Sequence, residues 1–411
     1  MKEREDELWE HLVSLQAQID RLTDADEGRL RRIRRLEKDR EALRHQLAGA
    51  RRKWWQTRKP RPVRADGPAP DPRPALEVPG VGLITEPEPP TTGPRRDLRV
   101  ATVLDPISAT VFGPEFHSRP ISATSWEPDI ESAGADLLFV ESAYQGHDGS
   151  WATRVARFGS PSDRLAGLVN WCRDHGVPTV FWNKEDPINF DWFVESARLF
   201  DHVFTVDGDQ IPRYQSILGH DRVHLLQFFA QPTIHYPGAE EGRTGTVAFA
   251  GSYFADKHPK RREQMEMLLD PAREFGLQIF DRHGDTDDPR FRWPDKYRPH
   301  IVGSLTYLQT VEAYRRYKVF LNVNTVTDSP TMCARRVFEL AACRTPIVSG
   351  PALALDGLSE QIAVVRSARE ASDAIAATLS ERGSPVSGEW IRNGHTAETR
   401  LGSVLESIGL S

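Results

Sequence analysis

The sequence predicts an α/β protein in which two parallel-sheet units follow one another and face a shared cleft, with a coiled coil in front of them. Leucine and isoleucine recur every three to four residues near the start of the chain. Short apolar, β-rich runs then alternate with helical stretches, and this alternation restarts once, near residue 246. Alternating strands and helices are typical of a parallel sheet that helices cover on both faces.

The composition is that of a soluble globular protein and excludes several classes. The 411 residues are 39% hydrophobic and 27% charged, and no apolar run reaches the ~18 residues that a membrane-spanning helix needs. The start MKEREDELWE lacks the apolar core of a signal peptide. Three scattered cysteines predict neither a disulfide framework nor a zinc site. We therefore expect a cytoplasmic protein.

The net charge of −6 is unevenly distributed along the chain. Residues 1–28 carry 3 basic and 9 acidic side chains, whereas residues 29–64 carry 15 basic and 3 acidic ones, which leaves −12 for the remainder. Because nucleic-acid-binding surfaces are basic, this acidic body argues against nucleic acid as a partner. The excess of positive charge is confined to the N-terminal arm.

The N-terminal arm follows a heptad pattern over residues 8–47, with nine of twelve core positions aliphatic and no proline. We assign residues 1–57 to a coiled coil and expect self-association through residues 8–47; a single charged helix on the body is the alternative. The segment RRKWWQTRKPRPVR (51–64) places two tryptophans among basic residues. It indicates either peripheral contact with an anionic membrane or a solvated charge run.

Residues 58–96 are predicted to be a proline-rich linker, because 11 prolines occur between positions 60 and 94 and little could form a core. The first α/β unit then spans residues 97–236. Helices are expected over residues 162–176 and 190–200. Strands are expected at LRVATVL, ADLLFVES, PTVFWN, HVFTVD and VHLLQFFA.

The second α/β unit spans residues 244–411, with helices expected over residues 260–269 and 307–316. A capping box of Thr306 and Gln309 opens the second of these helices. Its strands are expected at TVAFAGS, LQIFD, IVG, KVFLNVN and TPIVSG. Ligands of parallel sheets bind beyond the carboxyl ends of the strands, so we expect the site in the cleft between the two sheets.

The segment SPTMCARRVFELAAC carries the clearest candidate site. Ser329 followed by proline suits a helix start, so a helix is expected over residues 330–343. Its polar side presents Arg335, Arg336 and Glu339. Free N–H groups and two guanidinium groups suit a diphosphate, and the carboxylate suits the vicinal hydroxyls of a ribose. The same spacing also fits a plain salt bridge between Arg335 and Glu339.

Several segments, in order, resemble the CgeB-like (spore maturation protein) glycosyltransferases: FWNKEDPINFDWF, FDHVFTVD, FAGSY, GSLTYLQTVEAYRRYKVFLNVN, SPTMCARRVFELAAC and GHTAETR. The resemblance covers residues 97–410. It implies a GT-B architecture of two Rossmann-like domains, the first for the acceptor and the second for a nucleotide-sugar donor. It further implies sugar transfer to a glycan or other hydroxyl acceptor, in cell-surface or spore-surface glycan synthesis.

The resemblance also implies roles for single residues of the second unit. Relatives bind the donor ribose through a glutamate before a PIVS-like strand, and Glu339 occupies that place; Arg335 and Arg336 would then contact phosphate. Relatives also carry a second glutamate where this chain has threonine, and a glycine where it has Arg344. The candidate donor contacts beyond this helix core are Gly251, Ser252, Tyr307, Ser329 and Thr331. An ordinary tight turn at the glycine and a packed tyrosine are the alternatives.

In the first unit, NKEDP ends a strand where the cleft is expected. Glu185 or Asp186 is a candidate base for an acceptor hydroxyl, and capping of the next helix or pairing with Lys184 is the alternative. His117, after the first strand, is a third catalytic candidate through the resemblance.

No metal site and no cofactor besides the donor substrate are predicted. The triplets DGD and DTD are unremarkable in a chain with 59 carboxylates. Other function classes stay open: a nucleotide-sugar epimerase or phosphorylase of the same architecture, or a non-catalytic coiled-coil structural protein with a transferase-like body.

Overall fold

The computed structural model describes residues 74–87, 93–157, 159–358, 362–380 and 388–410, together with residues 35, 38, 39 and 42. Apart from these last four positions, the expected coiled coil and the basic segment 51–64 lie outside the described residues, so self-association and membrane contact stay predictions. Residues 68–411 form one compact unit that contains two six-stranded sheets. No described helix combines the length and the apolar character that crossing a membrane requires.

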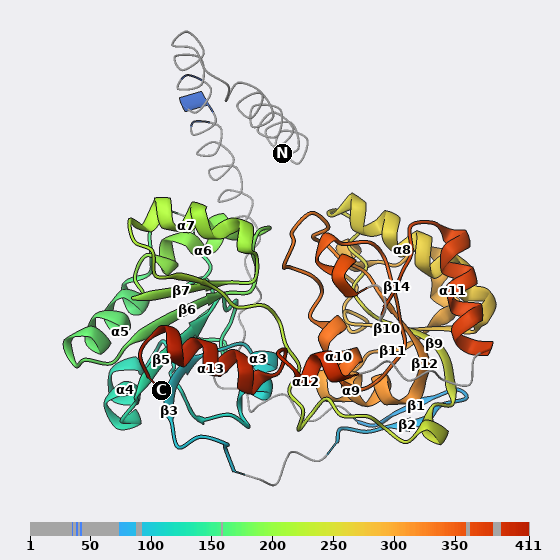
Figure 1. Ribbon diagram of the computed structural model, residues 1–411, viewed down its shortest axis with the longest axis horizontal. Helices are drawn as coiled ribbons and strands as arrows, with labels where there is room; N and C mark the ends of the chain where they lie inside the picture. Colours follow the sequence, from blue (N-terminus) through green and yellow to red (C-terminus); the bar gives the residue numbers. More distant parts are fainter. Residues whose placement is uncertain are drawn as a thin grey trace. The chain divides into compact units, whose positions relative to one another are not determined.

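The N-terminal sheet is parallel throughout, in the strand order β4-β3-β5-β6-β7-β8 (Figure 1). Its strands are β3 (Arg99–Val103), β4 (His117–Pro120), β5 (Leu137–Glu141), β6 (Thr179–Asn183), β7 (His202–Thr205) and β8 (Val223–Leu225). All were predicted except β4. This edge strand, HSRP, is polar and mostly exposed, so it lacks the apolar run that marks its neighbours.

The C-terminal sheet is also parallel, in the order β11-β10-β9-β12-β13-β14. Its strands are β9 (Gly245–Gly251), β10 (Leu277–Asp281), β11 (Ile301–Gly303), β12 (Tyr317–Asn322), β13 (Ile347–Ser349) and β14 (Ala363–Val364). The prediction of two parallel α/β units is thereby confirmed.

Helices follow most strands of both sheets. In the first they are α3 (Pro106–Phe112), α4 (Trp126–Ala133), α5 (Asp163–Asp174), α6 (Phe190–Ala197) and α7 (Ile211–Leu218). In the second they are α8 (Pro259–Ala272), α9 (Tyr307–Arg316), α10 (Arg336–Ala342), α11 (Ala368–Ser380), α12 (Glu389–Arg392) and α13 (Ala397–Ser407). Three of them, α11 to α13, come after the last strand. The predicted capping box of α9 is confirmed, because Thr306 and Gln309 bond reciprocally at its start.

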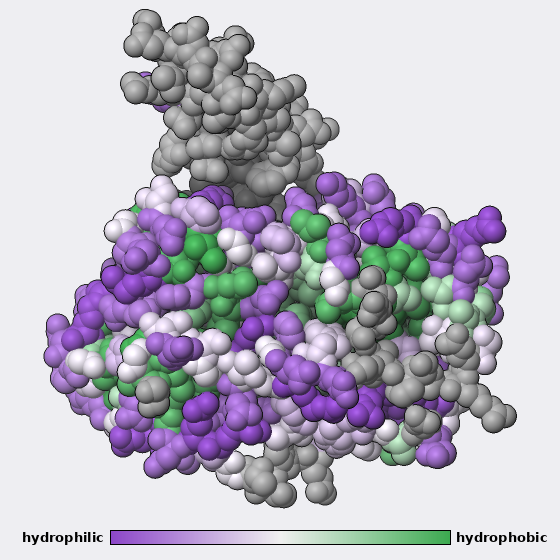
Figure 2. Space-filling view, viewed as in Figure 1, coloured by the Kyte–Doolittle hydropathy of each residue, from purple (hydrophilic) through white to green (hydrophobic). Residues whose placement is uncertain are grey.

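Short 3₁₀ helices complete the structure: η1 (Gly208–Gln210), η2 (Glu240–Gly242), η3 (Arg273–Phe275), η4 (Pro289–Phe291), η5 (Asp295–His300) and η6 (Leu353–Leu358). Successive residues of the buried strands face opposite sides of each sheet; Val100 and Ala101, for example, belong to different apolar clusters. On the face shown in Figure 2, hydrophilic residues cover much of the surface and apolar residues gather in separate patches.

The proline-rich linker is not structureless along its whole length, and this part of the prediction is wrong. Strands β1 (Leu76–Val78) and β2 (Gly82–Ile84) form an antiparallel hairpin. Val78 and Ile84 are fully buried in the largest apolar cluster, and Gln278 donates to the carbonyl of Pro79 at 2.9 Å. Alternating apolar residues around a turn at Gly80 carried this signal, but the surrounding prolines obscured it.

The C-terminal helix α13 returns the chain to the N-terminal sheet. Ala230 forms a parallel bridge with Thr396, and Arg95 pairs with Glu398 at 2.9 Å. Leu401 of α13 shares an apolar cluster with residues of β3 and α3, and Figure 1 shows helix α13 beside α3.

The helix expected over residues 330–343 begins later, since α10 spans only Arg336–Ala342. Its anticipated first turn is irregular, and other parts of the chain occupy its backbone groups. The carbonyl of Thr331 accepts from Gln227 at 2.8 Å, and the N–H of Ala334 donates to Asn324 at 3.1 Å. Phosphate binding by the N–H groups of a helix starting at residue 330 is therefore excluded.

Candidate functional site

Three arginines converge on the carboxyl end of β9. The guanidinium groups of Arg336 and Arg261 donate to the carbonyl oxygens of residues 250 and 252. The backbone N–H of Arg282 donates to the carbonyl oxygen of residue 251 between them. The Nε atoms of Arg336 and Arg261 are buried without a hydrogen-bond partner. Within the described residues, no carboxylate lies within 4 Å of any of the three guanidinium groups. We call these three residues the arginine cluster.

The arginine cluster concentrates positive charge. Burial and the charge of Arg336 lower the pKa of Arg261 to about 10. Partial desolvation and the charges of Arg335 and Arg336 lower the pKa of Arg282. Like charges lower one another's pKa in this way when no anion balances them. An anion bound at the end of β9 would relieve this repulsion.

Glu339, by contrast, is already engaged within the protein. Its Oε1 accepts from the Tyr307 hydroxyl at 2.9 Å and lies 3.1 Å from Nε of Arg335, while Oε2 accepts from the Tyr314 hydroxyl at 3.0 Å. Burial raises the pKa of Glu339. Arg335, His235 and the two hydroxyls lower it by more than this, so the pKa lies below the usual range. The salt bridge considered as an alternative is therefore present.

His235 extends this buried network. Its Nδ1 accepts from the backbone N–H of Gln231 at 2.8 Å. The ring proton therefore sits on Nε2, which donates to the Tyr307 hydroxyl at 2.9 Å. Burial, with Arg335 and Arg315 nearby, lowers the pKa of His235 to about 4 despite the opposing charge of Glu339. The histidine is thus neutral at physiological pH.

Ser329 and Thr331 bind the loop that follows β7. The Ser329 hydroxyl donates to Asp207 at 2.6 Å. The Thr331 hydroxyl accepts from the Gly208 N–H at 2.8 Å and donates to the Val206 carbonyl at 3.1 Å. These two residues, predicted to contact the sugar donor, therefore connect the loop after β12 of the C-terminal sheet to the loop after β7 of the N-terminal sheet.

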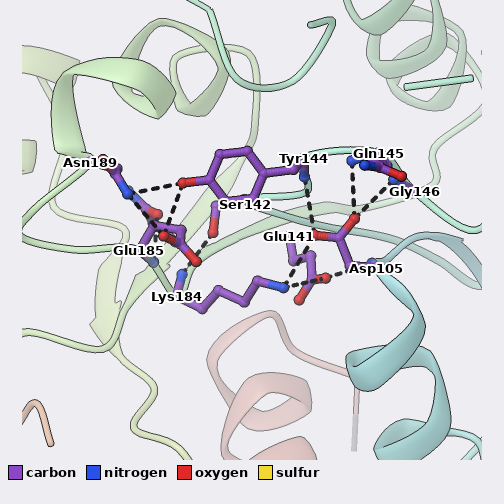
Figure 3. A network of polar contacts seen from close by, with 10 residues as sticks. Asp105, Glu141, Ser142, Tyr144, Gln145, Gly146, Lys184, Glu185 and Asn189 are labelled. Atoms are coloured by element: carbon purple, nitrogen blue, oxygen red, sulfur yellow. Dashed lines mark hydrogen bonds and ion pairs between the residues drawn. The ribbon is translucent and has the colours of Figure 1, made fainter. Parts of the chain in front are cut away.

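A second polar cluster lies at the carboxyl edge of the N-terminal sheet (Figure 3). Asp105 follows β3, Glu141 ends β5, and Lys184 and Glu185 follow β6. The Asp105 carboxylate accepts from the backbone N–H groups of residues 144–146 at 2.9–3.1 Å and from Nζ of Lys184 at 3.4 Å. Asp105 therefore fixes the loop after β5 against the end of β3.

Lys184 lies between two carboxylates, 2.8 Å from Oε1 of Glu141 and 3.4 Å from Asp105. Burial lowers the pKa of Lys184, but both carboxylates raise it by more, and its pKa is raised in sum. Burial raises the pKa of Glu141, whose Oε2 is enclosed without a hydrogen-bond partner among the described residues. The ammonium group of Lys184 therefore stays protonated and balances the negative charge of Glu141 and Asp105 at the edge of the sheet.

Tyr144, Glu185 and Asn189 form a separate chain of hydrogen bonds at this edge. The Tyr144 hydroxyl and the Asn189 amide both donate to Oε2 of Glu185, at 3.0 and 2.9 Å. Desolvation and the Glu185 carboxylate raise the pKa of Tyr144, so its hydroxyl keeps the proton that it donates. Among the described residues, no group of three or more His, Cys, Asp or Glu is arranged to hold a metal ion.

Residues 260–406 match the family model described as glycosyl transferase-like. This segment runs from α8 into α13 and contains the whole arginine cluster and Glu339. It comprises less than half of the chain and does not single out the CgeB-like family. A comparison with curated proteins finds no match.

Solved structures resemble this chain only weakly. The UDP-forming trehalose-phosphate synthase of Burkholderia vietnamiensis is 13% identical, with 75% of this chain and 78% of the other covered and a TM-score of 0.43. Anabaena HepE, solved with UDP, is 10% identical, with 75% of this chain and 91% of the other covered and a TM-score of 0.42. The N-terminal domain of Candida albicans trehalose-6-phosphate phosphatase is 11% identical, with 79% of this chain and 99% of the other covered and a TM-score of 0.46. With TM-scores below 0.5, these likenesses carry no functional argument.

The structure does not bring all the predicted catalytic residues together. Asp186 is fully buried, held by Asn183 at 2.8 Å and Thr205 at 2.6 Å, and burial raises its pKa to about 7. His117 begins β4 and pairs in register with Arg99, at the amino edge of the sheet. It therefore lies at the opposite end of the strands from Glu185. Of the three catalytic candidates, only Glu185 is at the carboxyl edge and partly exposed.

Sequence reasoning placed Gly251 and Ser252 at the turn after β9 and Arg336 on a helix as a phosphate contact; the structure brings Arg336 to the end of β9. It assigned no role to Arg261 or Arg282. Arg282 directly follows β10, so the rule that ligands bind beyond strand ends could have indicated it, whereas Arg261 lies in the first turn of α8 and carried no such signal. The same rule could have indicated the carboxylates after LRVATVL and ADLLFV. At Gly251 packing also constrains the residue type, because a Cβ atom would lie 3.0 Å from the Phe249 ring.

Proposed function

We propose that this protein is a GT-B glycosyltransferase that moves a sugar from a nucleotide-diphosphate donor to the hydroxyl group of a glycan or other acceptor. The arginine cluster is the observation that carries the proposal: guanidinium groups without a balancing carboxylate suit a diphosphate. The glycosyl transferase-like family match over the same segment supports it.

In this proposal the arginine cluster stabilises the negative charge that develops on the departing diphosphate. Fixed cations near that charge are already oriented before the reaction starts, so they lower its barrier. Gly251 and Ser252 would lie beside the phosphates, and Arg335 would add positive charge. The carboxylates at the edge of the N-terminal sheet would face the acceptor.

Nucleotide binding tests this function. Calorimetric titration with UDP, GDP and dTDP should identify one that binds, and Arg261→Gln or Arg282→Gln should each weaken binding about 10- to 100-fold, because each removes a charge-assisted contact. Arg369→Gln is the matched control, since this side chain is 93% exposed on α11. If none of the three nucleotides binds the folded protein, the transferase proposal is wrong and a structural role is favoured.

We further propose that transfer needs no divalent metal, because the arginine cluster supplies positive charge at the diphosphate. Nucleotide binding and turnover should then be unchanged in excess EDTA. A loss of both in EDTA that Mg²⁺ or Mn²⁺ restores would contradict this part of the proposal alone.

The products distinguish transfer from the other enzymatic classes. A transferase releases free nucleoside diphosphate in proportion to the glycoside formed. An epimerase alters the sugar, and a phosphorylase requires phosphate. A cytoplasmic location and a place in surface-glycan synthesis belong to this proposal, and linkage analysis of the product addresses the latter.

A further inference from the structure

Glu185 has two carboxylate oxygens in different situations. Oε2 accepts from Tyr144 and Asn189, as Figure 3 shows, whereas no described residue donates to Oε1. The backbone is fixed as well, since the Glu185 N–H donates to Asn183 at 3.1 Å and its carbonyl accepts from the Asn189 N–H at 3.0 Å. The carboxylate is thus oriented and keeps one oxygen available to a ligand.

The surroundings of Glu185 suit a sugar-like hydroxyl compound. Tyr144, whose hydroxyl bonds to the carboxylate, and Ile188, three residues after Glu185 in the chain, are exposed apolar side chains, at 40% and 42%. Apolar surface with a few placed polar groups is the usual lining of a small-molecule site. Burial lowers the pKa of Lys257 and of Arg282, and the negative charge of Glu185 opposes this lowering in both. Since Arg282 belongs to the arginine cluster, Glu185 interacts electrostatically with that cluster.

We propose, on the basis of the transferase function above, that Glu185 is a catalytic residue that receives the acceptor hydroxyl, and that Tyr144 and Asn189 position it. Oε1 accepts a hydrogen bond from the acceptor O–H, whose oxygen attacks the anomeric carbon of the donor. As the new C–O bond forms, the bond from that carbon to the diphosphate breaks and its electron pair leaves with the diphosphate. The hydroxyl proton passes to Glu185, which later gives it to water.

Glu141 and Asp186 are less suited to this step. Both are fully buried, Glu141 is paired with Lys184 at 2.8 Å, and Asp186 is held by Asn183 and Thr205.

Donor hydrolysis, in which water replaces the unidentified acceptor, tests the role of Glu185. UDP-glucose, UDP-N-acetylglucosamine, GDP-mannose and dTDP-glucose are the probes, and release of nucleoside diphosphate is the measurement. Glu185→Gln should lower kcat about 100-fold or more with the donor KM unchanged, because a positioned base contributes about 10²- to 10⁴-fold. Glu195→Gln, a surface carboxylate of α6 paired with Arg198 at 3.2 Å, should leave both constants unchanged.

Tyr144→Phe and Asn189→Ala should lower kcat by about 3- to 10-fold, also without a change in KM, since each removes one hydrogen bond to Oε2. A Glu185→Gln protein that keeps its donor affinity and hydrolyses as fast as the wild type overturns the proposal. A wild-type protein that binds a donor but releases diphosphate no faster than buffer also overturns it. Absence of binding by the wild type instead overturns the transferase function itself.

Discussion

Glu339 serves the protein through contacts that need no ligand. It accepts hydrogen bonds from two tyrosine hydroxyls and pairs with Arg335, which also lies 5.8 Å from the Tyr307 ring. Oε1 accepts one hydrogen bond and carries the ion pair with Arg335, whose Nε has no hydrogen-bond partner, whereas Oε2 accepts one hydrogen bond and has room for a second donor. A ribose contact therefore remains a proposal, restricted to one hydroxyl on Oε2.

Glu339→Gln separates a ribose contact from a purely internal role. We expect UDP to bind about 10-fold or more weakly to this variant, because hydrogen bonds to charged groups contribute about 1.5–3 kcal/mol. The preference for UDP over 2′,3′-dideoxy-UDP should disappear with it. Equal weakening of both nucleotides in calorimetric titrations would show that Glu339 only holds Arg335 in place.

At the scale of elements, the hairpin β1–β2 attaches the segment before the first sheet to the C-terminal sheet. Gln309 donates to the Pro74 carbonyl at 3.2 Å, and a Cβ atom on Gly303 would lie 2.9 Å from Leu76. The hairpin is therefore packed on β11 and α9 rather than loosely tethered.

Ile84→Ala should destabilise the protein by about 2–4 kcal/mol, because Ile84 is fully buried and its replacement leaves a cavity. Leu83→Ala is the matched control: the neighbouring side chain is 51% exposed, and its loss should change stability by less than about 0.5 kcal/mol. Urea denaturation of both variants measures the difference. Similar midpoints would mean that the hairpin does not contribute to folding.

The sequence predicted the buried strands and the capped helix well, because each carries a local signal. LQIFD and IVG match β10 and β11, and Thr306 with Gln309 marks the start of α9. It failed where distant partners decide. Asn324 and Gln227 hold the backbone of residues 331–334 out of a helix, and nothing local reveals these contacts.

The candidate site could be predicted only in part for the same reason. Glu185 stands out because it follows the end of a strand, and Arg336 because it lies on the polar side of an expected helix. The occupied state of Glu339 could not be predicted, since it depends on Tyr307, Tyr314 and Arg335 meeting around it.

For the whole molecule, three histidines govern the response to acid. Burial is the main cause that lowers the pKa of His235, His258 and His395 to about 4. Between pH 6.5 and 4 the unfolded chain binds protons that the folded chain does not. Asp186, whose pKa burial raises to about 7, has the opposite effect over this range. The three histidines outweigh this single carboxyl, so the free energy of unfolding should fall as the pH drops from 6.5 towards 4.

Stability measured by urea denaturation at several pH values checks this response. His235→Gln should reduce the loss of unfolding free energy between pH 6.5 and 4 by at most about 3 kcal/mol. This is the free energy that corresponds to a pKa shift from 6.5 to about 4. His147→Gln, a partly exposed control, should leave the slope unchanged. A wild-type stability that does not vary between pH 7 and 4 would contradict the buried, neutral state of His235.

The position of the hairpin has a consequence for synthesis on the ribosome. Pro74 precedes its hydrogen-bond partner Gln309 by 235 residues, so the hairpin leaves the ribosome before its packing surface exists. At roughly 5–20 residues per second the delay is on the order of 10 to 50 s. During that time Val78 and Ile84 have no surface to cover them, and the nascent chain must complete the second sheet before its earliest described strands can dock.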